Sequence, residues 1–359
     1  MKHAINPCTS PQSKPPELKA SQRTKRTIAI SIGDVNGVGC EILLRCLEWL
    51  HAHCEPIICA HQSILESALQ TLQAMEACSP SFCSTCRDLL AHTHFCPPQS
   101  PESSFAPHTI APAISAPPTI EIGRVSAQSG AYSFASFQQA IALAQSRQAH
   151  AIVTLPIHKA AWQAAGVHYA GHTEYLRAYF KRDVLMVLGC ERMFVALFCD
   201  HVPLACVSAM IEPSTYRDFL LTLARTLPLD SNSQALVLGF NPHCGDNGAI
   251  GGKEDALIQA ALTQANTILG RETFVGVCPP DSAFTPAMRA RFRVFVAPYH
   301  DIGLAPLKAL YFEESINISL NLPIARSSVD HGVAFDIAYR GCASVQSFKN
   351  AVLFHCQNL

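Results

Sequence analysis

The 359-residue sequence has no excess of charge of either sign, because 26 Lys and Arg residues are matched by 27 Asp and Glu residues. Proteins that bind nucleic acid usually concentrate basic residues on one surface, so this balance argues against nucleic acid as the main partner. No uninterrupted apolar run reaches the ~20 residues that span a bilayer, and we expect a soluble protein that does not act at a membrane. Residues 1–26 contain no apolar signal core, which argues against secretion and favours the cytoplasm.

A compact disulfide framework is also missing. The 16 cysteines are scattered from Cys8 to Cys356, and without a signal peptide they are best interpreted as reduced thiols. One cluster leaves a second interpretation open, because Cys83 and Cys86 have the two-residue spacing of half a zinc site. The other members of this cluster are Cys78, His92, His94 and Cys96. Their spacing is irregular, so we favour free thiols over a structural zinc.

What the sequence does contain is an alternation of strands and helices. Its length and its 49% hydrophobic content suit an interior divided between two lobes. Apolar runs predict strands at residues 27–32, 55–60, 150–155, 184–189, 194–199, 235–240, 274–278 and 294–298. Helical spacing predicts helices at or near residues 41–50, 129–148, 213–226, 254–269, 332–339 and 345–353. This alternation predicts an α/β architecture with mostly parallel strands, which places its chemistry at strand ends.

Two segments are expected to lie outside this architecture. Residues 1–26 are polar and contain several prolines, which predicts a disordered tail. Residues 97–118 contain seven prolines, which is typical of a loop. Together with the cysteine cluster this loop forms a Cys- and Pro-rich insertion near residues 78–118. The remainder, residues 27–359, is predicted to be a two-lobed α/β catalytic unit.

Three histidines follow three of the predicted strands. His201 follows FVALFC, His243 follows ALVLGF, and His300 follows VFVAPY. Each one alone could be an ordinary loop histidine, but their common placement suggests that they converge on one edge of a sheet. Three imidazoles with an open coordination position suit zinc or another first-row divalent ion in a catalytic site. A metal site and three unrelated loop histidines both remain open at this point.

A glycine-rich turn, GDVNGVG at residues 33–39, joins the first predicted strand to the helix that follows it. A turn of this kind can cradle a phosphate at the helix N-terminus. Its glycines do not have the spacing of the dinucleotide fingerprint, and no Walker lysine is present. We therefore favour a plain tight turn.

Several polar residues suit an anionic ligand. His172 and Thr173 precede a predicted helix that has Glu174 in its first turn. Thr173 could simply cap this helix, or the same helix end could bind an anionic group. Downstream, Asn317 lies in SINISLNLP, and Arg326 precedes a polar run that ends in Asp330 and His331.

The stretch YHDIGLAPLK, residues 299–308, follows the last of the three strands. We expect Gly303 to turn the chain, so that Lys308 returns to the pocket that contains His300. Lys308 is a candidate proton donor or acceptor, and it could equally anchor a carboxylate. Asp301 could orient a ligand or contact the metal.

These segments together resemble the family of 4-hydroxythreonine-4-phosphate dehydrogenases of pyridoxal phosphate biosynthesis. They occur in the order of the family, from residue 27 onward, over most of the chain. The matching segments are IAISIGDVNGVGCEI, IVTLPIHKAAWQAAGVHYAGHTEYL, LGFNPHCGDNGAIGGKE, YHDIGLAPLK, NISLNLPIARSSVDHGVAFDIAYRG and SVQSFKNAV. No single segment is specific, but the combination is.

The resemblance implies an oxidation of 4-phosphohydroxy-L-threonine by NAD or NADP, followed by decarboxylation to 3-amino-2-oxopropyl phosphate. It implies one divalent ion per subunit, zinc, cobalt or magnesium, bound by His201, His243 and His300. The substrate-binding residues that it implies are His172, Thr173, Lys308, Asn317 and Arg326, and Lys308 and Asp301 are the catalytic candidates. It further implies a homodimer whose active site lies at the subunit interface, with metal ligands from both chains. The implied fold is two-lobed and similar to that of isocitrate and isopropylmalate dehydrogenases.

Two positions depart from the family pattern, and two other functions remain as alternatives. GDVNG replaces the usual GDPAG, where Asn36 tolerates a positive φ. Leu155 replaces a glycine in LPIHK and could crowd the neighbouring backbone. A dehydrogenase of a phosphorylated four-carbon sugar acid would recognise the same carboxylate, hydroxyl and phosphate. A phosphate acyltransferase on a related fold would not need the three histidines.

Overall fold

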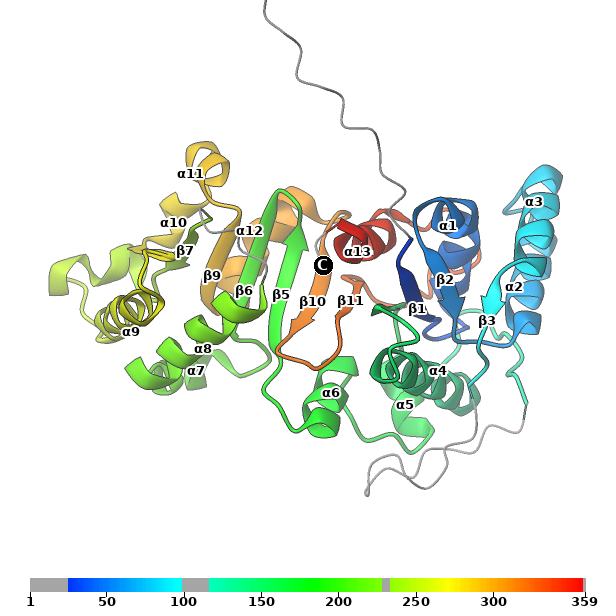
Figure 1. Ribbon diagram of the computed structural model, residues 1–359, viewed down its shortest axis with the longest axis horizontal. Coiled ribbons are helices and arrows are strands. Elements are labelled where there is room, and N and C mark those ends of the chain that lie inside the picture. Colours follow the sequence, from blue (N-terminus) through cyan, green and yellow to red (C-terminus); the bar gives the residue numbers. More distant parts are fainter. Residues whose placement is uncertain (1–24, 99–115, 228–232, 358–359) are drawn as a thin grey trace, which may run out of the picture.

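A single mixed sheet forms the centre of the molecule (Figure 1). The structure, a computed structural model, describes residues 25–98, 116–227 and 233–357. Within these residues the sheet has eleven strands in the order β3-β2-β1-β4-β11-β10-β5-β6-β9-β7-β8. The strands are β1 Thr27–Ser31, β2 Glu55–Ile58, β3 His94–Phe95, β4 Ala151–Thr154, β5 Leu185–Cys190, β6 Met193–Cys199, β7 Ala235–Leu238, β8 Phe274–Cys278, β9 Val294–Tyr299, β10 Ile316–Leu320 and β11 Arg326–Val329.

The sheet consists of two parallel flanks joined by antiparallel strands. Strands β3, β2, β1, β4 and β11 pair in parallel on one side, and β6, β9, β7 and β8 do so on the other. Between them, β10 runs antiparallel to β11 and β5, and β5 runs antiparallel to β6. The prediction of a two-lobed α/β fold with mostly parallel strands is confirmed. Because β6 and β9 run opposite to β1 and β4, the two flanks direct their carboxyl ends to opposite edges of the sheet.

Helices cover both faces of this sheet. They are α1 Gly39–His53, α2 Gln62–Ala74, α3 Pro80–Ala91, α4 Ala127–Gln145, α5 Lys159–Ala164, α6 His172–Phe180, α7 Leu204–Met210, α8 Pro213–Thr226, α9 Glu254–Leu269, α10 Pro280–Ala283, α11 Pro286–Arg291, α12 His300–Tyr311 and α13 Gln346–Gln357, with the 3-10 helix η1 Pro242–Gly248. Local signals explain some starts. At α3, for example, Ser79 Oγ accepts the N–H of Phe82 at 3.2 Å and Pro80 occupies the first turn. No helix of the described residues is long and apolar enough to cross a membrane.

The hydrophobic cores of the two faces differ. On one face a continuous core joins residues from α1, α2, α8, α9 and α13 to both flanks of the sheet. On the other face there are two separate cores. One lies beneath α4, α5 and α6 and includes Phe134 and Trp162, and the other lies beneath α12 and includes Phe295 and Leu307. Between these two cores the central strands present polar side chains, and this interruption is where the candidate site lies.

Several sequence predictions need correction or fall outside the described residues. The helix predicted at residues 332–339 is wrong, because this segment forms turns with positive φ at Ala334 (43°) and Tyr339 (60°). Most of the predicted tail and of the Pro-rich loop, residues 1–24 and 99–115, lies outside the described residues. The domain boundaries therefore stay a prediction.

The cysteine cluster lies mainly in α3 and β3. Cys83 and Cys86 are buried in the continuous core, and Cys86 Sγ is 3.7 Å from the carbonyl oxygen of Leu44. Cys78 and Cys83 have their sulfur atoms 3.1 Å apart. All cysteines in the described ranges are free, and no group of three His, Cys, Asp or Glu side chains there is arranged to hold a metal ion. These observations favour free thiols over the structural zinc.

Candidate active site

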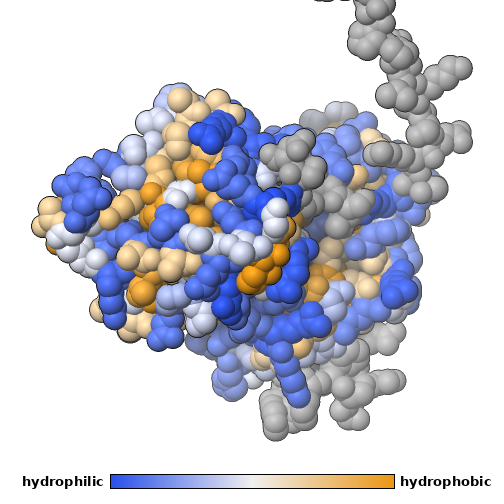
Figure 2. Space-filling view, turned by 60° about the vertical axis from the view of Figure 1, so that its left-hand side comes forward, coloured by the Kyte–Doolittle hydropathy of each residue, from blue (hydrophilic) through white to orange (hydrophobic). Residues whose placement is uncertain are grey.

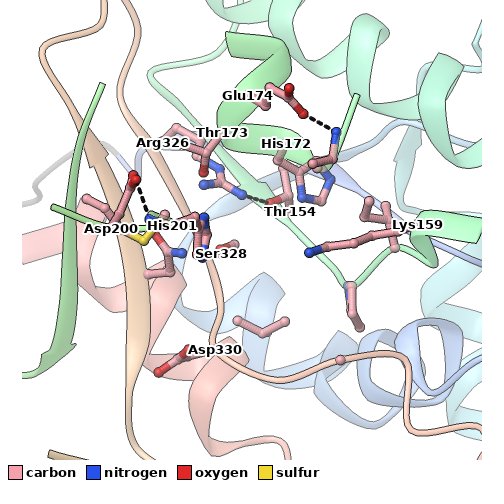
Figure 3. A pocket seen from close by; sticks show the side chains of 18 of the residues that line it. Thr154, Lys159, His172, Thr173, Glu174, Asp200, His201, Arg326, Ser328 and Asp330 are labelled. Carbon is pink, nitrogen blue, oxygen red and sulfur yellow. Dashed lines mark hydrogen bonds between the residues drawn. The ribbon is translucent and has the colours of Figure 1, made fainter. Parts of the chain in front are cut away.

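The gap between the two separate cores is a cavity of about 840 Å³ (Figure 3). Its walls come from the ends of β4 and β6, from β10 and β11, and from the N-terminal parts of α5 and α6. A smaller cavity of about 350 Å³ shares Met186, His201, Asn317 and Asp330 with it. The predicted substrate residues and two of the three predicted histidines line these two adjoining cavities. They are His172, Thr173, His201, His300, Lys308, Asn317 and Arg326, with Asp301 beside them.

The β10–β11 hairpin supplies the polar floor of the cavity. In β10 the side chains of Ile316 and Ile318 enter the continuous core, so Asn317 and Ser319 face the opposite side. In β11 the same alternation places Arg326 and Ser328 on the cavity side. The buried Asn317 Oδ1 has no hydrogen-bond partner among the described residues. A buried, unpaired acceptor that faces a cavity is available to a ligand.

Arg326 is the most deeply buried charge of the site, with 2% of its surface exposed. Its two terminal nitrogens donate to Ser319 Oγ and to Thr154 Oγ1, each at 2.8 Å, and its Nε has no partner in the described part of the chain. No carboxylate of the described residues pairs with it. Burial lowers the pKa of Arg326 to about 9, so the guanidinium is still charged at neutral pH. An uncompensated buried cation with spare donors favours the binding of an anion.

The N-terminus of α6 lies beside Arg326 in this cavity. Helix α6 begins at His172 and its N-cap is Gly171, so the alternative in which Thr173 caps the helix is wrong. No side chain bonds the N-cap position, which leaves backbone N–H groups of the first turn free to meet a ligand. The ring of His172 makes edge contacts with Phe137 and Trp162, and its buried Nε2 has no hydrogen-bond partner within the described ranges. Burial, followed by the nearby charge of Arg326, holds the pKa of His172 well below its ordinary value, so its imidazole is neutral.

His201 and His300 come together at the carboxyl ends of two neighbouring strands. Cys199 of β6 is in register with Tyr299 of β9, and the two imidazole rings that follow lie 5.8 Å apart between centroids. His300 Nδ1 lies 2.6 Å from Asp301 Oδ1. The predicted convergence therefore applies to these two histidines.

An ion pair fixes the backbone of His201. Asp200 Oδ1 accepts the N–H of His201 at 2.6 Å, and its other oxygen binds the guanidinium of Arg177 in α6. Burial lowers the pKa of His201, with Asp200 opposing this effect and with His300, Lys159 and Arg177 adding to it. The imidazole of His201 is therefore neutral at pH 7, as a metal ligand must be.

His243 is not part of this group. It lies in η1, where five consecutive residues, 243–247, have positive φ, and its side chain is exposed. Asp255 holds the start of this turn, since its carboxylate accepts the N–H groups of Phe240 at 2.7 Å and of Asn241 at 3.2 Å. Two imidazoles suit a zinc-type ion. The described part of one chain provides no third ligand, because it contains no three-residue metal-binding group.

Lys308 reaches the site along a helix. The expected turn at Gly303 is wrong, because residues 300–311 form α12 and Gly303 packs against β6. A Cβ on Gly303 would lie 2.5 Å from Val195 Cγ1, so the glycine permits close helix–sheet packing. Lys308 Nζ donates to the carboxylate of Asp330 at 2.5 Å and to its carbonyl at 2.8 Å. Ser315 Oγ also donates to this carboxylate, at 2.6 Å.

Sequence reasoning missed several residues that line the larger cavity. They are Thr154, Lys159, Arg177, Asp200 and Ser328. Thr154 and Ser328 could have been found as polar residues on the same face of strands as Arg326. The pairing of Arg177 with Asp200 joins α6 to the end of β6, and no local pattern predicts it.

The two departures from the family pattern differ in their place, because Leu155 lines the larger cavity and Asn36 does not. Gly33 has the positive φ of the first turn (68°), and Asn36 does not need one. Instead, Asn36 Nδ2 donates to the carbonyl of Arg124 at 2.9 Å. Leu155 is fully buried in the continuous core, and a Cβ added to Gly39 would lie 3.5 Å from its own Cβ.

Comparison with known proteins identifies clear relatives. A family model described as "Pyridoxal phosphate biosynthetic protein PdxA" matches residues 52–354. The 4-hydroxythreonine-4-phosphate dehydrogenase of Sulfurimonas denitrificans is 44% identical over 92% of the chain and 96% of its own length. That of Helicobacter pylori strain G27 is 42% identical over 92% and 99%. The crystal structure of 4-hydroxythreonine-4-phosphate dehydrogenase from Klebsiella pneumoniae is similar, with a TM-score of 0.71, 30% identity, and coverage of 92% of this chain and 100% of that one.

Proposed function

The chain belongs to the PdxA family of pyridoxal phosphate biosynthetic proteins, and from this premise we propose that it oxidises 4-phosphohydroxy-L-threonine with NAD, or with NADP in its place. The β-keto acid product then loses carbon dioxide to give 3-amino-2-oxopropyl phosphate. The observation that carries this proposal is the buried, unpaired Arg326 in a cavity that also contains His201. That cavity combines an anion site with a candidate metal ligand. Because the cysteines of the described residues are free thiols, we also propose a reducing compartment, the cytoplasm.

The anionic groups of the substrate match the free donors of the cavity. Arg326 has a spare Nε donor and a planar fork that suits a carboxylate or a phosphate. The first turn of α6, with His172 and Thr173, offers backbone donors to the other anionic group. Asn317 adds an unpaired amide oxygen, which can accept from the substrate ammonium.

We propose that one divalent ion per subunit, zinc, cobalt or magnesium, binds to His201, His300 and His243, with His243 coming from a second subunit. His243 is exposed on a firmly held turn, so its imidazole is free to enter a neighbouring site. The segments that follow His201 and His243 expose Leu204 (62%), Met210 and Ile250, and apolar groups are visible on this lobe (Figure 2). Exposed apolar side chains of this kind suit a homodimer interface that passes through the active site.

The side chains of this chain position the substrate and move its protons. The bound ion would lower the pKa of the substrate hydroxyl and polarise the resulting ketone. The carbon that carries the hydroxyl would give its hydride to the nicotinamide ring, while the hydroxyl would give its proton to a base, for which Lys308 is the candidate. When carbon dioxide leaves, its bonding electrons stay on the substrate as an enolate, and Lys308 can return a proton to carbon. Asp330 holds Lys308 in place, and Asp301 orients the ring of His300.

Replacing each of the three histidines by Ala tests the metal proposal. Each variant should lose one equivalent of bound metal and its turnover while it keeps the circular dichroism spectrum of the wild type. Full activity in all three variants would show that these histidines do not bind a metal ion needed for activity. In sedimentation, the wild type should be a dimer. A mixture of His201→Ala and His243→Ala proteins should regain partial activity, because one of the two sites in a dimer of the two variants keeps all three histidines.

The substrate is tested by comparing 4-phosphohydroxy-L-threonine with a phosphorylated four-carbon sugar acid at equal concentrations. The proposal requires the higher kcat/KM for the amino acid and one carbon dioxide released per reduced cofactor. A preference for the sugar acid would assign the alternative dehydrogenase activity. Acyl transfer to phosphate by metal-free protein would assign the acyltransferase.

A further inference from the structure

Several charges around the two adjoining cavities are already paired within the chain. Arg177 pairs with Asp200, and Lys308 pairs with Asp330. The carboxylate of Glu174 accepts the backbone N–H of Ala170. The two ion pairs leave neither Arg177 nor Lys308 with its full charge available to a ligand.

Two cationic side chains on the cavity wall remain without an acidic partner in the described ranges, Arg326 and Lys159. Lys159 is the first residue of α5, and its side chain is exposed and extends into the cavity (Figure 3). Its charge is close enough to His201 to contribute to the lowered pKa of that imidazole. Lys159 therefore shares the space of the proposed substrate site, although the roles proposed above do not include it.

The proposed substrate has two anionic groups, a phosphate and a carboxylate, and the cavity has two uncompensated cations. We propose that Lys159 binds the phosphate of the substrate. This inference rests on the proposed function. The guanidinium of Arg326 is fixed by Ser319 and Thr154, so its remaining N–H groups have fixed directions in one plane, which suits a planar carboxylate. An ammonium on a flexible chain can approach a tetrahedral phosphate from any side.

The test compares Lys159→Met with the wild type on two substrates, 4-phosphohydroxy-L-threonine and unphosphorylated 4-hydroxy-L-threonine. For the phosphorylated substrate, kcat/KM should fall by about 10- to 100-fold, the effect of one charge-assisted hydrogen bond, mainly through KM. For the unphosphorylated substrate, kcat/KM should not change. Lys159→Arg should keep most of the affinity because it keeps the charge. Lys181→Met is the matched control, since Lys181 is an exposed lysine that ends α6 away from the cavity lining.

Each other outcome overturns the inference. Equal losses on both substrates would assign Lys159 to the carboxylate, and a raised KM for NAD alone would assign it to the cofactor pyrophosphate. Unchanged kinetics would remove Lys159 from the site. Thermal unfolding of each variant shows whether it is folded, and if Lys159→Met is not, the smaller change Lys159→Gln replaces it. A wild-type protein that forms no NADH with either substrate would instead refute the proposed function.

Discussion

Replacing Arg326 by Met should weaken substrate binding strongly while it changes the free energy of unfolding only slightly. The guanidinium has no acidic partner among the described residues, and burial lowers its pKa from its ordinary value to about 9. At ~1.4 kcal/mol per pKa unit, the folded chain bears several kcal/mol of desolvation cost for this charge. Substituting a buried ion by an apolar side chain of similar size is often neutral or stabilising by ~1–4 kcal/mol. The loss of two hydrogen bonds to Ser319 and Thr154 costs roughly 1 kcal/mol each.

The free energy of unfolding of Arg326→Met should therefore lie between about 1 kcal/mol below the wild-type value and about 2 kcal/mol above it. Substrate binding should suffer instead, because a buried charge-assisted contact is worth roughly 2–5 kcal/mol. This corresponds to a fall in kcat/KM of about 30-fold to 5,000-fold. Arg326→Lys keeps a charge but not the planar fork, so its kcat/KM should also fall, by roughly one to three decades.

The assay is urea unfolding with and without substrate. At 100 times its Kd, substrate stabilises the wild type by about 2.7 kcal/mol. If the variant binds 30-fold more weakly, the same concentration stabilises it by only about 0.9 kcal/mol. A variant that is strongly destabilised but still binds substrate with wild-type affinity would refute this reasoning, because Arg326 would then be a structural group.

Other predictions concern stability in acid, metal affinity and the cysteines. Burial lowers the pKa of His355 to about 3, so its contribution to stability is present above the unfolded-state value of about 6.5 and is lost as pH falls. At pH 4.5 this contribution to the free energy of unfolding should be about 3 kcal/mol smaller than at neutral pH. Urea unfolding of His355→Gln should lack this part of the pH dependence, and a pH dependence equal to that of the wild type would contradict the prediction. Asp200→Asn should weaken Co²⁺ binding by about 10-fold or more in a titration, because Asp200 orients His201, whereas the exposed Asp183→Asn should not. Replacing both Cys83 and Cys86 by Ser should leave bound metal unchanged in elemental analysis, and the loss of one zinc would restore the zinc interpretation.

The sequence was most informative where strands are buried on both faces. Apolar runs located β1, β4, β6 and β9 to within a residue or two, because such strands need no polar alternation. The β10–β11 hairpin was missed because its polar residues, Asn317, Ser319 and Arg326, resemble a surface loop. They are polar because they line the cavity at the centre of the sheet. Helix α12 was missed because Gly303 and Pro306 are unfavourable inside helices.

Tertiary contacts decide the remaining differences. Residues 332–339 have the spacing of a helix, but Val333 accepts the N–H of Val38, and Tyr339 Oη donates to the carbonyl of Val35 at 2.6 Å. These hydrogen bonds to the glycine-rich turn at residues 33–39 stabilise the segment in turns instead of a helix. The convergence of His201 and His300 was predictable because their strands are neighbours. The position of His243 was not, because it depends on a left-handed turn that no strand pattern encodes.

The most direct test of the central claim is NADH formation from 4-phosphohydroxy-L-threonine and NAD, followed by absorbance, before and after treatment with a chelator. The account predicts turnover by the untreated protein, its loss in the chelator, and its recovery when Zn²⁺, Co²⁺ or Mg²⁺ is restored. No NADH under any of these conditions would contradict the proposed oxidation. Undiminished turnover in a preparation shown by elemental analysis to contain no metal would contradict the role of the histidines.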